Sequence, residues 1–500
     1  MKLSYILKKE LAPLAWVASI NNAVVTVTHG NQVETYSDFF VAGAWNGSFS
    51  KGNFIESDWF CGTGATLKKN KIIFSTPSHV TTSLFYDFNA ISGEIVVSNS
   101  LHLLCAYAGY HLDAQYVNYE CDFNSILFGI YKYKRHLKVL EQNNHPKNIT
   151  TVYFRHIAID DQNHLSEEVK QPADPFVDFS DYYSRLCKAI SGLIQNAADP
   201  MRKVAYGTVT TISKGYDAPC CATIAKKYGC NTALTFQAKG KYSQDSGVEI
   251  AKKLGYPHII EQDAQSYLTR TDLVETLAIS SGELGTDLHF IAFEQNCKNN
   301  LVFTGDRGDR IWNIHTSDCN KEFSFVDTFN HRGASERHLW VAYIPVPMPL
   351  YGASQWPSIQ AISQSKEMEP WSLQNNYNRP IPRRICEEAN LPREMFGIKK
   401  QGAGINLRFD LINRIRRRLS PAAATNFTQF VRETKKFHPV QVISYFWKTR
   451  KLYLARIGIH AGPRMNPRDI SQIPNATAAR YLFPWAGEKV IQAYQKALGR

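Results

Sequence analysis

One short polar turn in the chain contains residue types that together can bind an anion. The turn consists of Ser213, Lys214, Gly215, Tyr216 and Asp217. A serine hydroxyl, a glycine backbone and a lysine ammonium can all contact phosphate oxygens. The β-branched run at 203–212 predicts a buried strand before the turn, and the residues after it predict a helix that ends at Gly229. Because a helix N-terminus attracts anions, we expect a phosphate or pyrophosphate cradle here, with Asp217 as a candidate metal ligand.

A second glycine turn follows another predicted strand, at residues 301–305. It carries Asp306, Arg307 and Asp309 close together. These carboxylates, with Asp217 opposite, are the hard oxygen ligands that suit Mg²⁺ above a triphosphate. The competing interpretation is a surface turn held together by local Asp–Arg pairs.

A glycine-rich loop late in the chain carries two adjacent lysines, Lys399 and Lys400. Its glycines disfavour regular helix. A flexible loop bearing a lysine can cover a polyphosphate and stabilise the charge that develops during group transfer. An ordinary basic surface loop has the same composition, and the sequence does not choose between the two lysines.

The first part of the chain is predicted to form an α+β domain with stacked antiparallel sheets. Residues 10–160 contain short apolar runs closed by Gly, Asn, Ser or Pro. Helical stretches between residues 100 and 129 interrupt these runs. A polar, proline-containing segment at 167–178 then separates this part from the rest. We place the boundary so that the two domains span residues 1–172 and 173–500.

The second part is predicted to form an α/β domain. Strands and helices alternate from residue 178, with strands at 231–236, 258–263 and 301–305 after the one that precedes Ser213. Such alternation is typical of a parallel sheet with helices on both faces, whose ligands bind at the carboxyl ends of the strands. The two glycine turns therefore face one crevice if their strands are neighbours. Beyond residue 330 the chain is predicted to be mainly helical, with several proline breaks.

The composition is that of a globular protein with a basic surface. The chain has 500 residues and a formal net charge of +13. This charge favours an anionic substrate, although a basic surface alone explains it, and nucleic acid is disfavoured because no known binding module is recognised. The ten cysteines contain no CxxC pair and are expected to be reduced. No apolar run suits a signal peptide or membrane span, so we expect a cytoplasmic protein without a membrane partner; a homodimer is left open.

In their order along the chain, these motifs resemble the asparagine synthetase family. That family joins an N-terminal class II glutaminase, an Ntn-type sandwich, to a C-terminal ATP-pyrophosphatase domain. Residues 213–218 resemble its pyrophosphate loop, usually written SGGxDS. The stretch NTALTFQAKGKYSQDSGVEIAKKLGYPHI resembles the part of the family that holds adenine. The resemblance implies that Thr235 and Phe236 contact the nucleotide.

Three further stretches carry the resemblance. TGDRGDRI resembles a second Gly-Asp loop whose acidic residue binds Mg²⁺, which implies Asp217 and Asp309 as metal ligands and Gly305 as a nucleotide contact. GIKKQGAG resembles the family's late lysine loop. The N-terminal half resembles the glutaminase more faintly, in GAWNGSF, in the GTG at 62–64 and in DFNSILFG.

The chain also departs from the family pattern. A working glutaminase of this class uses an N-terminal cysteine exposed by removal of Met, whereas residue 2 is Lys2 and the first cysteine is Cys61. The N-terminal domain is therefore expected to be degenerate, and glutamine is not expected to supply nitrogen. In the pyrophosphate loop Lys214 replaces a glycine and Ala218 replaces a serine. The expected reaction, in which a carboxylate is adenylated and then attacked by an amine already on a substrate, resembles that of β-lactam synthetases and lasso-peptide cyclases.

The expected activity is that of an ATP-dependent, AMP-forming ligase. A small-molecule or peptide carboxylate attacks the α-phosphate to give an acyl-adenylate and pyrophosphate, and an amine then forms the amide and releases AMP. Lys400 (or Lys399) and Arg307 are expected to stabilise charge, and Asp306 or Glu336 to remove the proton from the amine. Two alternatives remain open: a scaffold protein that has lost activity, and an RNA-modifying ATP-pyrophosphatase.

Overall fold

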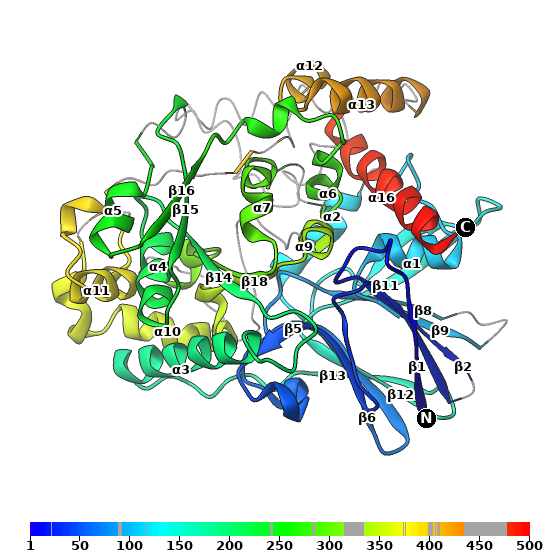
Figure 1. Ribbon diagram of the computed structural model, residues 1–500, viewed down its shortest axis with the longest axis horizontal. Helices are drawn as coiled ribbons and strands as arrows, with labels where there is room; N and C mark the ends of the chain where they lie inside the picture. The colour runs from blue at the N-terminus through cyan, green and yellow to red at the C-terminus, as the bar shows by residue number, and fades with distance from the viewer. Residues whose placement is uncertain are drawn as a thin grey trace, which may run out of the picture.

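The computed structural model describes most of the chain. Its description leaves out residues 22, 89–92, 117, 241–243, 283–284, 286, 315–334, 374, 376, 399–403, 406, 408–410 and 435–477, and the side chains of Leu127 and Ser335. The described residues form three β-sheets, two in the N-terminal part and one in the C-terminal part (Figure 1). None of the described helices is both long and apolar enough to cross a membrane.

The first sheet of the N-terminal part has the order β1-β3-β2-β9-β8-β11-β10. Its strands are β1 (Lys2–Leu7), β2 (Trp16–Asn21), β3 (Val24–His29), β8 (Leu84–Phe88), β9 (Ile95–Ser98), β10 (His136–Leu140) and β11 (Pro146–Val152). The second sheet has the order β13-β12-β7-β6-β5-β4. Its strands are β4 (Glu34–Thr35), β5 (Phe39–Trp45), β6 (Phe60–Lys68), β7 (Lys71–Ser75), β12 (Arg155–Asp160) and β13 (Leu165–Val169).

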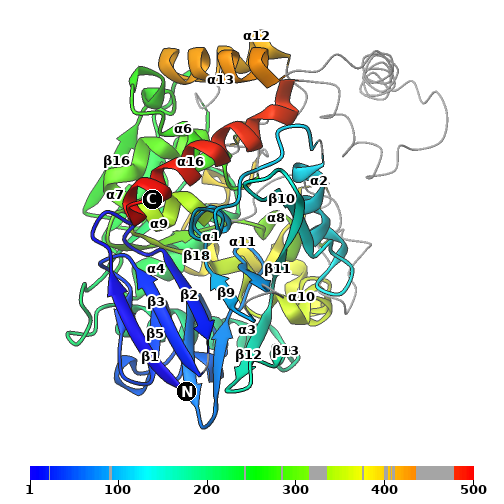
Figure 2. The same ribbon diagram turned by 90° about the vertical axis from the view of Figure 1, so that its right-hand side faces the viewer.

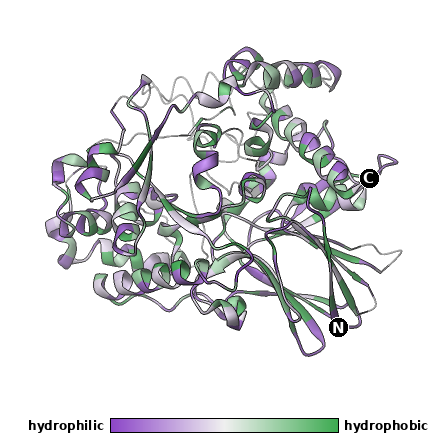
Figure 3. Ribbon diagram, in the orientation of Figure 1, coloured by the Kyte–Doolittle hydropathy of each residue, from purple (hydrophilic) through white to green (hydrophobic). Residues whose placement is uncertain are grey.

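These two sheets form a sandwich. Every pairing between neighbouring strands is antiparallel except that of β1 with β3. Across the sandwich, the Trp16 ring of one sheet lies 4.9 Å from the Phe40 ring and 5.9 Å from the Phe74 ring of the other, measured between centroids. Figure 3 shows hydrophobic residues along these strands. The expected antiparallel sheets are confirmed, with helices α1 (Leu101–Ala108) and α2 (Tyr119–Asn124) in the predicted region.

The third sheet is parallel and has the order β16-β15-β14-β17-β18. Its strands are β14 (Gly207–Thr211), β15 (Thr232–Phe236), β16 (His258–Gln262), β17 (Asn300–Thr304) and β18 (Ile344–Pro347). Leu301 and Phe303 pack into one core, with α3 (Phe179–Ala197), α4 (Asp217–Lys227) and α11 (Pro380–Glu388). Val302 packs into another, with α7 (Glu294–Cys297) and α9 (Ser335–Val341). The predicted parallel sheet with helices on both faces is confirmed.

The described chain beyond residue 330 is mainly helical, as predicted, but it also contains a strand that was not predicted. Helices α9, α10 (Trp356–Ser363), α11, α12 (Ile412–Arg416), α13 (Pro421–Thr434) and α16 (Leu482–Leu498) lie there, together with strand β18. This strand was not predicted because it contains Pro345 and Pro347, and proline disfavours a strand in the middle of a sheet. Strand β18 tolerates both prolines because it lies at the sheet edge, paired only with β17.

The C-terminal helix α16 returns to the N-terminal sandwich and packs beside α1 (Figures 1 and 2). Val490, Ile491 and Tyr494 of α16 belong to the same buried cluster as the sandwich strands. The core that covers this sheet therefore includes residues from both ends of the described chain.

A buried basic cluster lies in the sandwich. Lys170 directly follows β13, is only 6% exposed, and has its ammonium 5.5 Å from the centroid of the Phe60 ring. Burial lowers the pKa of Lys170 to about 7. Burial, followed by the charge of Lys170, also lowers the pKa values of His79 and His156, each to about 3. Each group is therefore disfavoured in its charged form in the folded protein.

Replacing Lys170 with methionine should change how stability depends on pH above neutrality. Because the pKa of Lys170 is lower in the folded protein, the unfolded chain binds more protons between pH 7 and 10. The free energy of unfolding should therefore rise with pH in the wild type, by at most about 1.4 kcal/mol per pH unit, and this rise should be smaller in Lys170→Met. Urea unfolding at pH 7 and pH 9 measures the difference. Equal pH dependence in the two proteins would contradict it.

Candidate active site

The polar turn from Ser213 to Tyr216 lies where the order of the parallel strands reverses. It connects the central strand β14 to helix α4. The next strand along the chain, β15, pairs with one edge of β14, and β17 pairs with the other edge. Ligands of open α/β sheets bind at such a reversal, outside the carboxyl ends of the strands. The eleven residues of α4 begin at Asp217, so the helix N-terminus lies at the same place.

The second glycine turn lies directly against the first. Residues 305–307 connect β17 to α8 (Gly308–Ile311), and Arg307 has a φ of +70°. A Cβ atom at Gly305 would lie 2.6 Å from the carbonyl carbon of Asp217, and one at Gly308 would lie 2.5 Å from Asp217 Cγ. Only glycine permits this approach. The structure thus brings Asp217, Gly305 and Gly308 together, as expected for neighbouring strands.

Helix α11 adds an arginine that the sequence analysis did not select. The Arg379 guanidinium donates from Nη1 to Asp217 Oδ2 in an ion pair, and its side chain is only 3% exposed. Burial by itself lowers the pKa of Arg379, but Asp217, Tyr377 and Asp309 outweigh burial and raise it above the usual value.

The side chain of Tyr216 holds the first turn against helix α11. Its side chain is fully buried, and its hydroxyl accepts a hydrogen bond from Arg383 Nη2 of α11. Its ring centroid lies 4.8 Å from that of Tyr377 and 6.1 Å from that of Phe396. The predicted nucleotide contact of Tyr216 is therefore limited to its backbone, because the side chain is used in packing.

Other predicted binding residues lie in the first turn and at the end of β15. Ser213 Oγ accepts a hydrogen bond from the Gly215 backbone at 3.3 Å, and the exposed Lys214 receives one at its carbonyl from Gly397 N at 2.8 Å. Thr235 Oγ1 accepts from the backbone N–H of Gly247 at 2.9 Å and is buried.

Phe236 ends strand β15 beside Thr235. Its ring lies 5.0 Å from that of Phe293, measured between centroids, so it packs partly into the neighbouring core. Thr235 and Phe236 thus lie at the carboxyl end of the strand next to β14, where the resemblance expects the nucleotide.

The four catalytic candidates lie in different places. Asp306 and Arg307 lie in the second glycine turn, beside Asp217. Lys400, like Lys399, lies outside the described residues. Glu336 is not brought to the two turns: it lies on α9, is 1% exposed, and its Oε1 accepts hydrogen bonds from Ser100 at 2.5 Å and His102 at 3.0 Å.

Glu336 instead joins three parts of the fold. Its second oxygen accepts a hydrogen bond from the hydroxyl of Tyr494 on α16, at 3.0 Å.

Replacing Glu336 with glutamine should lower the free energy of unfolding by about 1–3 kcal/mol, because buried hydrogen bonds to a charged acceptor are lost. Tyr494→Phe removes one of them and should cost less. Unfolding in urea measures both, and unchanged stability of Glu336→Gln would contradict this structural role.

Asp217, one of the two predicted metal ligands, does not present open oxygens in this arrangement. Asp217 Oδ2 is paired with Arg379, and Oδ1 is buried beside the position that a Gly308 side chain would occupy. Magnesium needs near-octahedral coordination and usually keeps several waters. Over the part of the chain that is described, no group of three or more His, Cys, Asp or Glu side chains could hold a metal ion. Asp217 as arranged does not fit a bound Mg²⁺.

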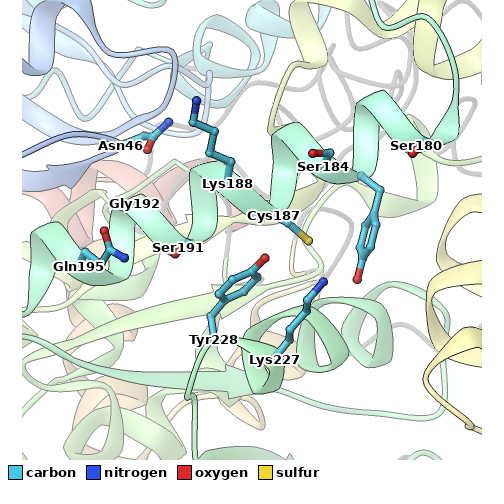
Figure 4. A pocket seen from close by; sticks show the side chains of 11 residues that line it. Asn46, Ser180, Ser184, Cys187, Lys188, Ser191, Gly192, Gln195, Lys227 and Tyr228 are labelled. Atoms are coloured by element: carbon cyan, nitrogen blue, oxygen red, sulfur yellow. The ribbon is translucent and has the colours of Figure 1, made fainter.

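A separate hollow of about 570 Å³ lies near the opposite end of α4 (Figure 4). Helix α3 supplies much of its lining, including Cys187 and Lys188, and Lys227 and Tyr228 lie across from them. The hollow contains none of the residues predicted for nucleotide binding.

Comparison with known proteins places the chain in no family. No protein-family model matches it, and no curated protein matches it either. The assignment of a function therefore depends on the residues of the two turns and on the resemblance carried by the motifs.

Arg379 and Arg383 are the residues that sequence reasoning missed. They lie in the run NRPIPRRI, where prolines at the start of a helix indicate α11. The run follows the second glycine turn by about seventy positions in the chain, and nothing in its composition shows that it folds against the first turn.

Proposed function

We propose that the protein is an ATP-dependent, AMP-forming ligase that joins a carboxylate to an amine in the cytoplasm, without hydrolysing glutamine. The observation that carries the proposal is the contact of the two glycine turns at the reversal of strand order, where Gly305 and Gly308 pack against Asp217. The antiparallel sandwich supports a relation to the Ntn-type glutaminase.

In the proposed reaction the first turn binds the pyrophosphate part of ATP. The Ser213 hydroxyl, the Lys214 ammonium and the N–H groups of the first turn of α4 supply the contacts. Thr235 and Phe236 border the adenosine. A substrate carboxylate attacks the α-phosphorus, the bond to the bridging oxygen breaks, and pyrophosphate leaves.

The second step transfers the activated acyl group. An amine attacks the carbonyl carbon of the acyl-adenylate, AMP leaves, and the proton of the amine is taken up by Asp306. Arg307, and Lys400 of the late loop, stabilise the negative charge that develops on the oxygens. The substrates are a small-molecule or peptide carboxylate and amine.

A nucleotide product assay tests the proposal. ATP is incubated with the protein and with pooled carboxylates and amines, and the nucleotides are separated by chromatography. We expect AMP and pyrophosphate in equal amounts, formed only when a carboxylate is present. ADP and phosphate as the products would contradict the proposed reaction.

A second candidate function is a binding protein that has kept the fold. The ion pair between Asp217 and Arg379 favours it, because an aspartate used in packing is not free to act on a nucleotide. Tight binding of ATP that never leads to AMP, across all substrate pools, would support this candidate.

A further inference from the structure

Arg379 lies against the acidic residue of the first turn, in a place where a cation is expected. It is the residue directly before α11, and its guanidinium pairs with Asp217 of the first turn. Asp217 in turn lies against the positions of Gly305 and Gly308 in the second turn. The Arg379 guanidinium also lies 4.8 Å from the centroid of the Tyr377 ring and 5.7 Å from that of Tyr216. These aromatic faces, together with burial, hold the charge in place.

The charges of the two turns show what Arg379 contributes. Residues 213–217 and 305–310 carry three basic and three acidic side chains, which are Lys214, Arg307, Arg310, Asp217, Asp306 and Asp309. The charged side chains of the two turns therefore sum to zero, and Asp245, whose carboxylate accepts a hydrogen bond from Lys214 N at 3.3 Å, adds a further negative charge. Arg379 supplies a positive charge that offsets it. A guanidinium has five N–H donors and needs only one for Asp217, so further donors remain for phosphate oxygens.

We propose that Arg379 is the permanent cation of this site, so that the two turns bind the pyrophosphate group of a nucleotide without a divalent metal between Asp217 and Asp309. The proposal rests on the proposed function for the class of ligand. In it, Arg379 is a binding and positioning residue: it fixes Asp217 and supplies positive charge at the helix N-terminus, in the place where Mg²⁺ was expected from the sequence.

Titration of inorganic pyrophosphate by calorimetry tests the proposal. The wild type, Arg379→Ala and Arg384→Ala are titrated once in EDTA and once in Mg²⁺. Arg384 is a matched control because it lies on α11, five positions after Arg379, but pairs with Glu367 and Glu388. We expect the wild type and the control to bind in EDTA within about threefold of their affinity in Mg²⁺.

For Arg379→Ala we expect binding in EDTA to weaken at least about tenfold, because a buried charge partner is lost. Mg²⁺ should restore much of it, since the ion can then enter the space between the two carboxylates. Two results would overturn the proposal: a wild type that binds at least about tenfold more weakly in EDTA, or Arg379→Ala binding in EDTA as tightly as the wild type.

A second variant covers the case in which Arg379→Ala does not fold. The double variant Asp217→Asn with Arg379→Gln removes both charges and keeps polar side chains at both positions, so no buried charge is left alone. It should fold and lose pyrophosphate binding in EDTA; retained binding would overturn the proposal. Binding by the wild type only in Mg²⁺ rejects this inference and leaves the ligase proposal standing. Binding of neither pyrophosphate nor an ATP analogue in either condition rejects both.

Discussion

Replacing Gly305 with alanine should strongly weaken nucleotide binding. The new Cβ would lie 2.6 Å from the carbonyl carbon of Asp217 and 2.8 Å from the backbone nitrogen of Ala218. Backbone atoms at the start of α4 cannot rotate away, so the second turn must move from the first. We expect stability to fall by about 1–3 kcal/mol, as for other overpacked sites. Because the two turns no longer meet, affinity for an ATP analogue should fall about 100-fold.

Gly215→Ala is the matched control for this prediction. A Cβ at Gly215 would meet its nearest atoms, Tyr377 Oη and Ser213 Oγ, at 3.5 and 3.7 Å, which are ordinary contact distances. Its free energy of unfolding should therefore stay close to that of the wild type. Both variants are compared by urea unfolding and by calorimetric titration. Wild-type affinity in Gly305→Ala would refute the account of how the two turns meet.

The protein should lose stability steeply in mild acid, and His79 should be a main cause. The pKa of His79 is about 3 in the folded protein, lowered mainly by burial, against 6.5 in the unfolded chain. Between these values the unfolded chain binds one more proton, so acid favours unfolding. From pH 7 to pH 5 this amounts to about 2 kcal/mol for His79. His156, whose pKa is also lowered to about 3, adds a loss in the same direction.

The variant His79→Gln isolates this effect. The free energy of unfolding is measured in urea at pH 7 and pH 5 for the wild type, for His79→Gln and for His164→Gln, whose histidine is exposed. We expect the fall between the two pH values to shrink by about 2 kcal/mol in His79→Gln alone. An equal fall in all three proteins would show that His79 does not titrate in this way.

The parallel sheet and its two turns could be predicted from the sequence because each signal is local. The β-branched strand before Ser213, the helix that follows, and the strand that ends at Thr304 are each visible in consecutive residues. Once the strands are known to be parallel, their carboxyl ends must share one edge of the sheet. The contact of Gly305 with Asp217 follows from that rule.

Features that depend on distant parts of the chain could not be predicted. Arg379 pairs with Asp217 across more than 160 positions, and no local pattern marks this contact. Glu336 was a candidate base, but the fold directs it to Ser100 and Tyr494. Such buried polar contacts are set by tertiary packing, because each partner alone resembles an ordinary surface residue.

The most direct test of the central claim is calorimetric titration of a non-hydrolysable ATP analogue, with Mg²⁺ present so that binding is not limited by the metal. The wild type is compared with Lys214→Glu, in the first glycine turn, and with Lys188→Glu, in the separate hollow on α3. The account predicts that the wild type and Lys188→Glu bind alike and that Lys214→Glu binds at least about 100-fold more weakly. No binding by folded wild type, or loss of binding only in Lys188→Glu, would contradict the claim that the nucleotide site lies at the two glycine turns.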